Sequence, residues 1–181
     1  SLSGTPLSTS TSEATSTATT QPGQRFASLS DIKGTVQVKA NPNANWTTVT
    51  APINIAPGAT VLTSENGSVK ITFSPEGTIV RLNAQTQFTL TDMSGDTANP
   101  ITTLKLDFGK VFTVVTKALG SGKFEIKMPV GVAAVRGSYM SAESNSTDNI
   151  EVVTCLEGLC TYNNNNGNVN LITNQYTQAV R

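Results

Sequence analysis

The feature that most constrains the fold is a series of short segments in which apolar and polar residues alternate, each closed by a turn. Between Ser68 and Phe73, for example, Val69, Ile71 and Phe73 fall on one face. A period of two residues is typical of a half-buried β-strand. About a dozen such segments follow one another, with turns every 8–12 residues, and no segment convincingly predicts a helix.

This pattern predicts an all-β fold: an antiparallel β-sandwich or β-roll of about a dozen short strands, with an extended N-terminal segment. The composition agrees, because 28 Thr suit pleated strands and 16 Asn suit turns among the 181 residues. The residues expected to face a shared core are Val69, Ile71, Phe73, Leu82, Phe124 and Ile126.

The composition also argues against most functions that depend on a reactive site. The sequence contains no histidine, its 12 basic and 12 acidic residues cancel, and its acids do not cluster with aromatic residues. Histidine-dependent catalysis and histidine metal ligation are therefore excluded, and general attraction to nucleic acid is not expected. No apolar run approaches the roughly 20 residues of a membrane span. We expect no enzyme activity, no cofactor, no nucleic-acid partner and no membrane span in this chain.

Two cysteines point to an oxidising compartment. Cys155 and Cys160 flank a segment in which Glu157-Gly158 could form a two-residue hairpin turn. The cysteines would then face each other on neighbouring strands, within disulfide range. The alternative is a pair of reduced, buried thiols. The expected disulfide, together with a chain that starts at Ser1 and not at Met, predicts export to the extracellular space or the cell surface.

The chain divides into a Ser/Thr-rich N-terminal segment, residues 1–25, and a β domain, residues 26–181. Thirteen of the first twenty residues are Ser or Thr. Such a segment cannot bury enough apolar surface to fold alone.

Several motifs of the β domain, over roughly residues 28–181, resemble the FecR family. The motifs are Gly34-x-Val36-x-Val38, Trp46, Gly58, Val69-x-Ile71-x-Phe73, Glu76-Gly77, Val80-Arg81-Leu82, Gly109-Lys110-Val111, Pro129, Val135-Arg136-Gly137-Ser138 and Leu156-Glu157-Gly158. The resemblance implies an all-β domain outside the cytoplasm. The family's namesake passes a receptor signal to a sigma factor through a membrane span and a cytoplasmic segment, neither of which this sequence shows. Ser138 stands where the family has Thr, and the cysteine pair is not part of the family pattern.

A few polar residues could carry function or only structure. Arg81 and Arg136 lie within apolar strands, where pairing with an acid or with backbone carbonyls is favoured over ligand binding. The loop from Asp92 to Asn99 offers oxygen ligands for calcium, but an Asx-rich turn is the favoured interpretation. Asn45, Asn66 and Asn145 are possible N-glycosylation sites in predicted loops.

Two functions remain open. In the first, the chain is a structural subunit of an extracellular filament whose partners are copies of itself, joined head to tail by the N-terminal segment as an added β-strand. The segment residues assigned to this joint are Leu2, Leu7, Thr11, Ala14, Thr15, Thr17 and Ala18. In the second, the chain is a monomeric FecR-like sensory or ligand-binding module, and the segment tethers it at the cell surface.

Overall fold

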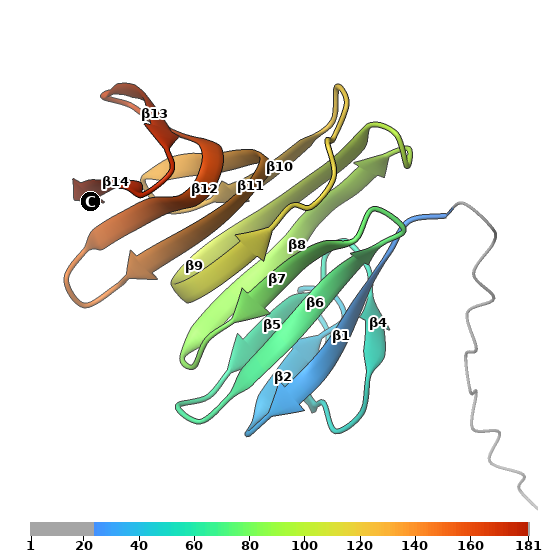
Figure 1. Cartoon of the computed structure of the whole chain (residues 1–181). Helices are drawn as coiled ribbons and strands as arrows, with labels where there is room; N and C mark the ends of the chain where they lie inside the picture. Colours follow the sequence, from blue (N-terminus) through green and yellow to red (C-terminus); the bar gives the residue numbers. More distant parts are fainter. Residues whose placement is uncertain (1–23, 181) are drawn as a thin grey trace, which may run out of the picture.

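The structure is a computed structural model that describes residues 24–180. These residues form fourteen β-strands and no helix (Figure 1), which confirms the all-β fold. The described part of the chain accordingly offers no helix with the length and hydropathy of a membrane span.

The strands follow one another with short connections. The first seven are β1 (Phe26–Lys33), β2 (Val36–Lys39), β3 (Thr47–Thr48), β4 (Ile53–Ile55), β5 (Thr60–Thr63), β6 (Ser68–Ser74) and β7 (Thr78–Leu82). The second seven are β8 (Thr86–Gly95), β9 (Pro100–Val114), β10 (Lys123–Lys127), β11 (Gly131–Asn145), β12 (Ile150–Asn164), β13 (Gly167–Ile172) and β14 (Gln175–Val180).

Hydrogen bonds join all fourteen strands into one sheet, which is folded into two layers. Layer 1 runs β4-β1-β6-β7 and continues through the second halves of β9 and β11 and the first half of β12 to β14. Layer 2 runs β3-β2-β5-β8 and continues through the first half of β9, β10, the first half of β11 and the second half of β12 to β13. The rings of Phe73 in layer 1 and Phe124 in layer 2 meet edge to face, 5.9 Å apart, between the layers.

The chain crosses between the layers at two opposite ends of the sandwich. In the N-terminal half most crossings lie at end A, which comprises residues 34–35, 64–67, 83–85 and 108–110. The exception is the segment 56–59, which joins β4 in layer 1 to β5 in layer 2 at the end of β5 remote from end A. In the C-terminal half it crosses at end B, which comprises residues 115–122, 136–139, 156–159 and 173–174. The two ends are opposite because, along β9, Ser144 pairs with Gly109 whereas Tyr139 pairs with Val114.

One strand pair departs from the expected antiparallel arrangement, because β9 and β10 are parallel. The first half of β9 runs towards end A and its second half returns to end B in the other layer. Residues 115–122 then cross at end B, so β10 starts where β9 started and runs the same way. The parallel pair is thus a consequence of the bend in β9.

The core lies between the two layers and contains the six predicted residues. Val69, Ile71, Phe73, Leu82, Phe124 and Ile126 are all at most 2% exposed. The prediction of a shared core is therefore confirmed.

A buried arginine ties the start of β1 to the hairpin of β8 and β9. Arg25 forms an ion pair with Glu76, and both side chains are 4% exposed. The guanidinium also donates to the carbonyl oxygens of Ser94 and Ile101 and to the hydroxyl of Thr102. A guanidinium held by an acid and by carbonyl oxygens has its donors satisfied, which burial requires.

Candidate interaction surface

The disulfide lies at the bend of β12, and the predicted hairpin is wrong. Cys155 and Cys160 are bonded, with their Cα atoms 5.6 Å apart. They belong to one strand, β12, whose first half pairs with β14 and whose second half pairs with β13. Both halves keep β11 as their other neighbour, so Cys155 pairs with Met140 and Cys160 with Val135. The disulfide thus joins the two layers across a bend.

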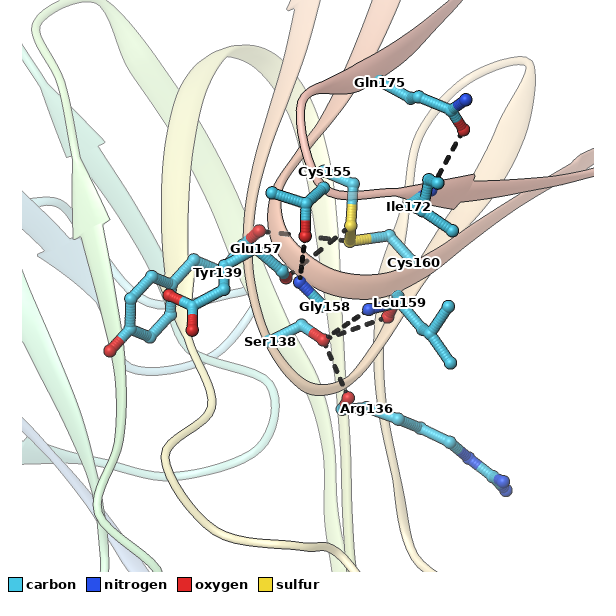
Figure 2. Close-up of a disulfide and its surroundings, with 11 residues drawn as sticks. Arg136, Ser138, Tyr139, Cys155, Glu157, Gly158, Leu159, Cys160, Ile172 and Gln175 are labelled. Carbon is cyan, nitrogen blue, oxygen red and sulfur yellow. Dashed lines mark hydrogen bonds between the residues drawn. A yellow bond between two sulfur atoms is a disulfide. The ribbon is translucent and has the colours of Figure 1, made fainter.

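Ser138 holds this bend in place (Figure 2). Its Oγ is 2.8 Å from the carbonyl oxygen of Arg136 and accepts a hydrogen bond of 2.8 Å from the N–H of Leu159. A Cβ on Gly158 would lie 2.2 Å from this Oγ, and Gly158 has a φ of +82°. Only glycine fits at that position, because it must tolerate both the left-handed backbone and the close approach.

The outer face of layer 1 is apolar beside this bend. We call Ile79, Phe112, Val114, Tyr139, Val152 and Tyr176 the apolar face. Strand register places them on one side of the sheet: Val114 pairs with both Ile79 and Tyr139, and Thr154 pairs with Tyr176. Residues directly opposite on neighbouring strands share a face, so these side chains point away from the core together.

Two tyrosines make the apolar face accessible, and one pair of charges at its border is engaged within the molecule. Tyr139 is 40% exposed and Tyr176 is 69% exposed. Lys110 forms an ion pair of 3.2 Å with Glu143, and its Nζ lies 5.4 Å from the ring centroid of Phe112. Contiguous exposed apolar surface with aromatic side chains is typical of protein–protein contacts.

The two arginines singled out in the sequence have different environments. Arg81 lies 3.8 Å from Asp31, which also pairs with Lys70 at 2.7 Å. The hydrogen bond from Lys70, together with the nearby positive charges, lowers the pKa of Asp31. Arg136 is exposed at the bend and has no ion pair among the described residues, so the expected pairing is wrong there. Its backbone carbonyl, not its guanidinium, contributes to the bend.

The loop from Asp92 to Asn99 is stabilised by its own side chains. Asp96 accepts hydrogen bonds from the backbone N–H groups of Ala98 and Asn99, and these bonds lower the pKa of its carboxyl. Residues 24–180 contain no cluster of acids, cysteines or histidines that could hold a metal ion. This geometry is that of an Asx turn.

Two of the three possible glycosylation sites border the same groove at end A. Asn66 and Asn145 line an open polar groove of about 800 Å³, and Asn45 is exposed in the loop before β3. Whether these residues carry glycans stays a prediction. The residues assigned to assembly, Leu2, Leu7, Thr11, Ala14, Thr15, Thr17 and Ala18, lie outside the described residues.

The sequence prediction missed the apolar face, although the sequence carried a signal for it. Residues 111–115 and residues 78–80 are runs in which both strand faces are apolar or β-branched, so alternation is lost. A strand without alternation is typical of contacts on both faces. Here one face contacts the core and the other is the apolar face.

Comparison with protein families gives one match. The model of the family described as "FecR protein" matches residues 59–160, which include the bend of β12 up to Cys160. A comparison with curated proteins gives no match.

Two of the solved structures that this fold matches belong to one kind of protein. Two crystal structures of a proposed anti-sigma factor from Parabacteroides distasonis ATCC 8503 align with a TM-score of 0.58 and sequence identities of 20% and 19%. Each alignment covers 67% of this chain and 54% of the other, so the chain matches about half the length of those proteins. At this identity the likeness establishes the fold.

Proposed function

Since the chain belongs to the FecR family, we propose that it is an extracytoplasmic sensory module that binds a protein partner through the apolar face. The single observation that carries the proposal is the exposure of two tyrosines of the apolar face, Tyr139 and Tyr176, on the outer side of layer 1. A monomer gains nothing by leaving such a surface in water, whereas a partner that covers it removes apolar area from water.

The chemistry of the described residues supports a binding role. Charged side chains around the apolar face, such as Lys110 and Glu143, pair with each other. A Tyr or Trp anchor commonly carries much of the binding energy of an interface, and Tyr139 is the exposed aromatic residue of the apolar face beside the bend. The disulfide and Ser138 fix the bend beside Tyr139, so the ring is held on a rigid support.

The solved neighbours indicate the kind of pathway. They are proposed anti-sigma factors, and we propose by extension that this module reports an extracellular signal to a regulator of that type. Its role would then be regulatory and not catalytic. The filament function considered from the sequence has no support from the family or from the solved neighbours.

Site-directed photo-crosslinking in the source cells tests the proposal. A photo-reactive amino acid replaces Tyr139, and its adducts are identified by mass spectrometry. We expect one defined protein other than this chain to be captured. The Tyr139→Ser variant should weaken binding of that protein at least tenfold.

The control uses an exposed apolar residue on the other layer. Leu159 is 62% exposed on the outer face of layer 2, and its replacement by the photo-reactive amino acid should capture little of the same protein. Leu159→Ser should leave the affinity unchanged. Equal capture from both positions, or adducts consisting only of copies of this chain, would contradict the proposal.

A further inference from the structure

Among the described residues the two layers end in four edge strands, and these edges are not alike. Layer 1 ends at β4 and β14, and layer 2 ends at β3 and β13. Edge strands expose unpaired N–H and C=O groups, so proteins shorten them, charge them or interrupt them with proline. The edges near the N-terminal half follow this rule: β3 has two residues, and β4 has three residues between Pro52 and Pro57.

The edge at β14 lacks every one of these protections. β14 has six residues, Gln175–Val180, without a charge or a proline, and it pairs in unbroken register with β12 alone within the described chain. Tyr176 and Val180 are 69% and 67% exposed, the highest values among the large apolar side chains. β13 is also an edge, but Gly167, Asn168 and Asn170 make half of it from residues that disfavour strands.

A groove accompanies this edge. Its volume is about 470 Å³, and it lies between β13 and β14, where Tyr162, Val169, Ala179 and Val180 contribute to its lining. A strand added beside β14 would extend layer 1, so every second side chain would point into this groove.

Residues 11–20 of this chain have the matching composition. They are Thr, Ser and Ala with a single acid, Glu13. Threonine favours strands, and β-branched residues pair well across strands with aromatic and β-branched side chains such as Tyr176 and Val180. The segment carries no bulky side chain that the groove would have to exclude.

The place where the described chain begins indicates which copy supplies the strand. The segment joins the fold at Arg25, beside β1, which lies at the opposite end of layer 1 from β14 (Figure 1). The twenty-three residues before Gln24 span at most about 80 Å when extended, at 3.3–3.6 Å per residue. A neighbouring molecule that places its β1 end next to β14 delivers the segment directly.

We propose that β14 is an acceptor edge to which residues 11–20 of a second copy of this chain add as a β-strand. Each copy then offers a donor at one end of layer 1 and an acceptor at the other, so the contact repeats head to tail. The proposal does not rest on the sensory function: the two surfaces share Tyr176, but strand addition uses the backbone edge of β14 and does not involve Tyr139.

Isotope-resolved photo-crosslinking tests this contact on the full chain. The photo-reactive amino acid replaces Gln178, which is exposed on β14, and heavy-isotope-labelled chains are mixed with unlabelled chains. We expect adducts between Gln178 of one isotope and residues 11–20 of the other. The matched control replaces Asn54, exposed on the protected edge β4, and should give no such adduct.

Paired substitutions in the donor segment separate backbone pairing from side-chain contact. The double variant Thr15→Pro/Thr17→Pro should reduce the mixed-isotope adduct at least tenfold, because proline cannot donate to the ladder. Thr15→Ala/Thr17→Ala keeps the N–H groups and should retain most of the adduct. These substitutions change no residue of the fourteen strands, which lie within residues 24–180.

Each other result overturns the proposal. Adducts to residues 11–20 of the same isotope only would place the segment on its own domain. Adducts elsewhere on a second copy would mean a different interface. The absence of any adduct from folded protein at concentrations up to the millimolar range would exclude a useful contact. The two proposals can fail separately. The expected adduct from Gln178 without a partner adduct from Tyr139 supports only strand addition, and the reverse result supports only the proposed function.

Discussion

Glu151 and Tyr162 come into contact because β12 bends between them. Both lie in that strand, eleven positions apart, yet the hydroxyl of Tyr162 donates a buried hydrogen bond of 2.9 Å to Oε2 of Glu151. Oε1 accepts the N–H of Val130 at 2.7 Å. Burial, reinforced by the hydrogen bond to Glu151 and the charge of its carboxylate, raises the pKa of Tyr162.

This raised pKa predicts a loss of stability in alkali. Below about pH 10 tyrosine is protonated in both states, so the stabilisation is complete. Above that pH the unfolded chain loses the proton while folded Tyr162 keeps it. The free energy of unfolding should therefore fall by about 1.4 kcal/mol per pH unit from this residue. Urea denaturation at a series of pH values measures it.

Tyr162→Phe is the comparison, because it removes the titrating group and keeps the ring. The variant should be about 1–3 kcal/mol less stable at neutral pH, since it leaves a buried carboxylate oxygen without its donor. The gap between the two proteins should narrow above about pH 10. Lysines titrate equally in both proteins. If the difference between their free energies of unfolding stays constant above about pH 10, the pH dependence does not come from Tyr162.

The sequence could predict some of these residue pairs and not others. The disulfide was predictable because Cys155 and Cys160 are near neighbours in the chain. The contacts of Arg25 with Glu76 and of Glu151 with Tyr162 were not, because they depend on which strands face each other across the sandwich. No local pattern records that information.

At the scale of elements, glycines decide where long strands can bend. Gly137 in β11 and Gly158 in β12 both have positive φ, at +54° and +82°. They differ in their surroundings, because a Cβ at Gly137 would meet nothing within 4 Å, whereas one at Gly158 would meet Ser138. The same substitution at Gly137 and at Gly158 therefore separates the cost of backbone strain, which both positions share, from the cost of the steric contact with Ser138, which only Gly158 has.

We predict that Gly158→Ala destabilises the protein much more than Gly137→Ala. A left-handed conformation costs an alanine about 1–2 kcal/mol at either position. At Gly158 the new methyl group also displaces Ser138 from its bond to Leu159, which adds a lost hydrogen bond of about 1 kcal/mol or more. Chemical denaturation of both variants checks this, and equal losses would mean that the contact with Ser138 is not tight.

The wrong hairpin at residues 155–160 has an instructive cause. A Gly that follows an acid between two apolar strands is a common hairpin signal. The same residues also suit a bend within a strand, if neighbours on each side hold its two halves in different layers. β13 and β14 supply those neighbours, and they come later in the sequence than the bend itself.

At the scale of the whole molecule, crossings at opposite ends divide the sandwich. The C-terminal half crosses only at end B within the described chain, and the disulfide closes one of these crossings. Its closed loop is short, so the loop-entropy model gives about 2 kcal/mol for the bond.

The double variant Cys155→Ala/Cys160→Ala should lose about this much stability, and the loss should be uneven. Without the bond the halves of β12 can separate, which loosens β13 and β14 first because each pairs with one half. Amide hydrogen exchange should show reduced protection there and little change in β1 and β6 relative to the global loss. Uniform loss across all strands would contradict this division.

The class of the fold and its core could be predicted because alternation depends only on neighbouring residues. Phe73 and Phe124 were both assigned to the core on that ground. Three other features depend on the path of the whole chain. They are the contact of these two rings across the layers, the parallel pairing of β9 with β10, and the different ends at which the two halves of the chain cross between the layers. The apolar face was partly predictable. The sequence shows that alternation is lost in residues 78–80 and 111–115, but it does not show what the second apolar side of these strands contacts.

The anchoring of Arg25 has a mechanical consequence. A pull on the N-terminal segment would reach the fold at this residue and divide at once among Glu76, Ser94, Ile101 and Thr102. The load would then run along β1, which lies between β4 and β6, so its ladder bonds would resist together in shear. A tether or a fibre joint attached here would transmit tension without unzipping the first strand.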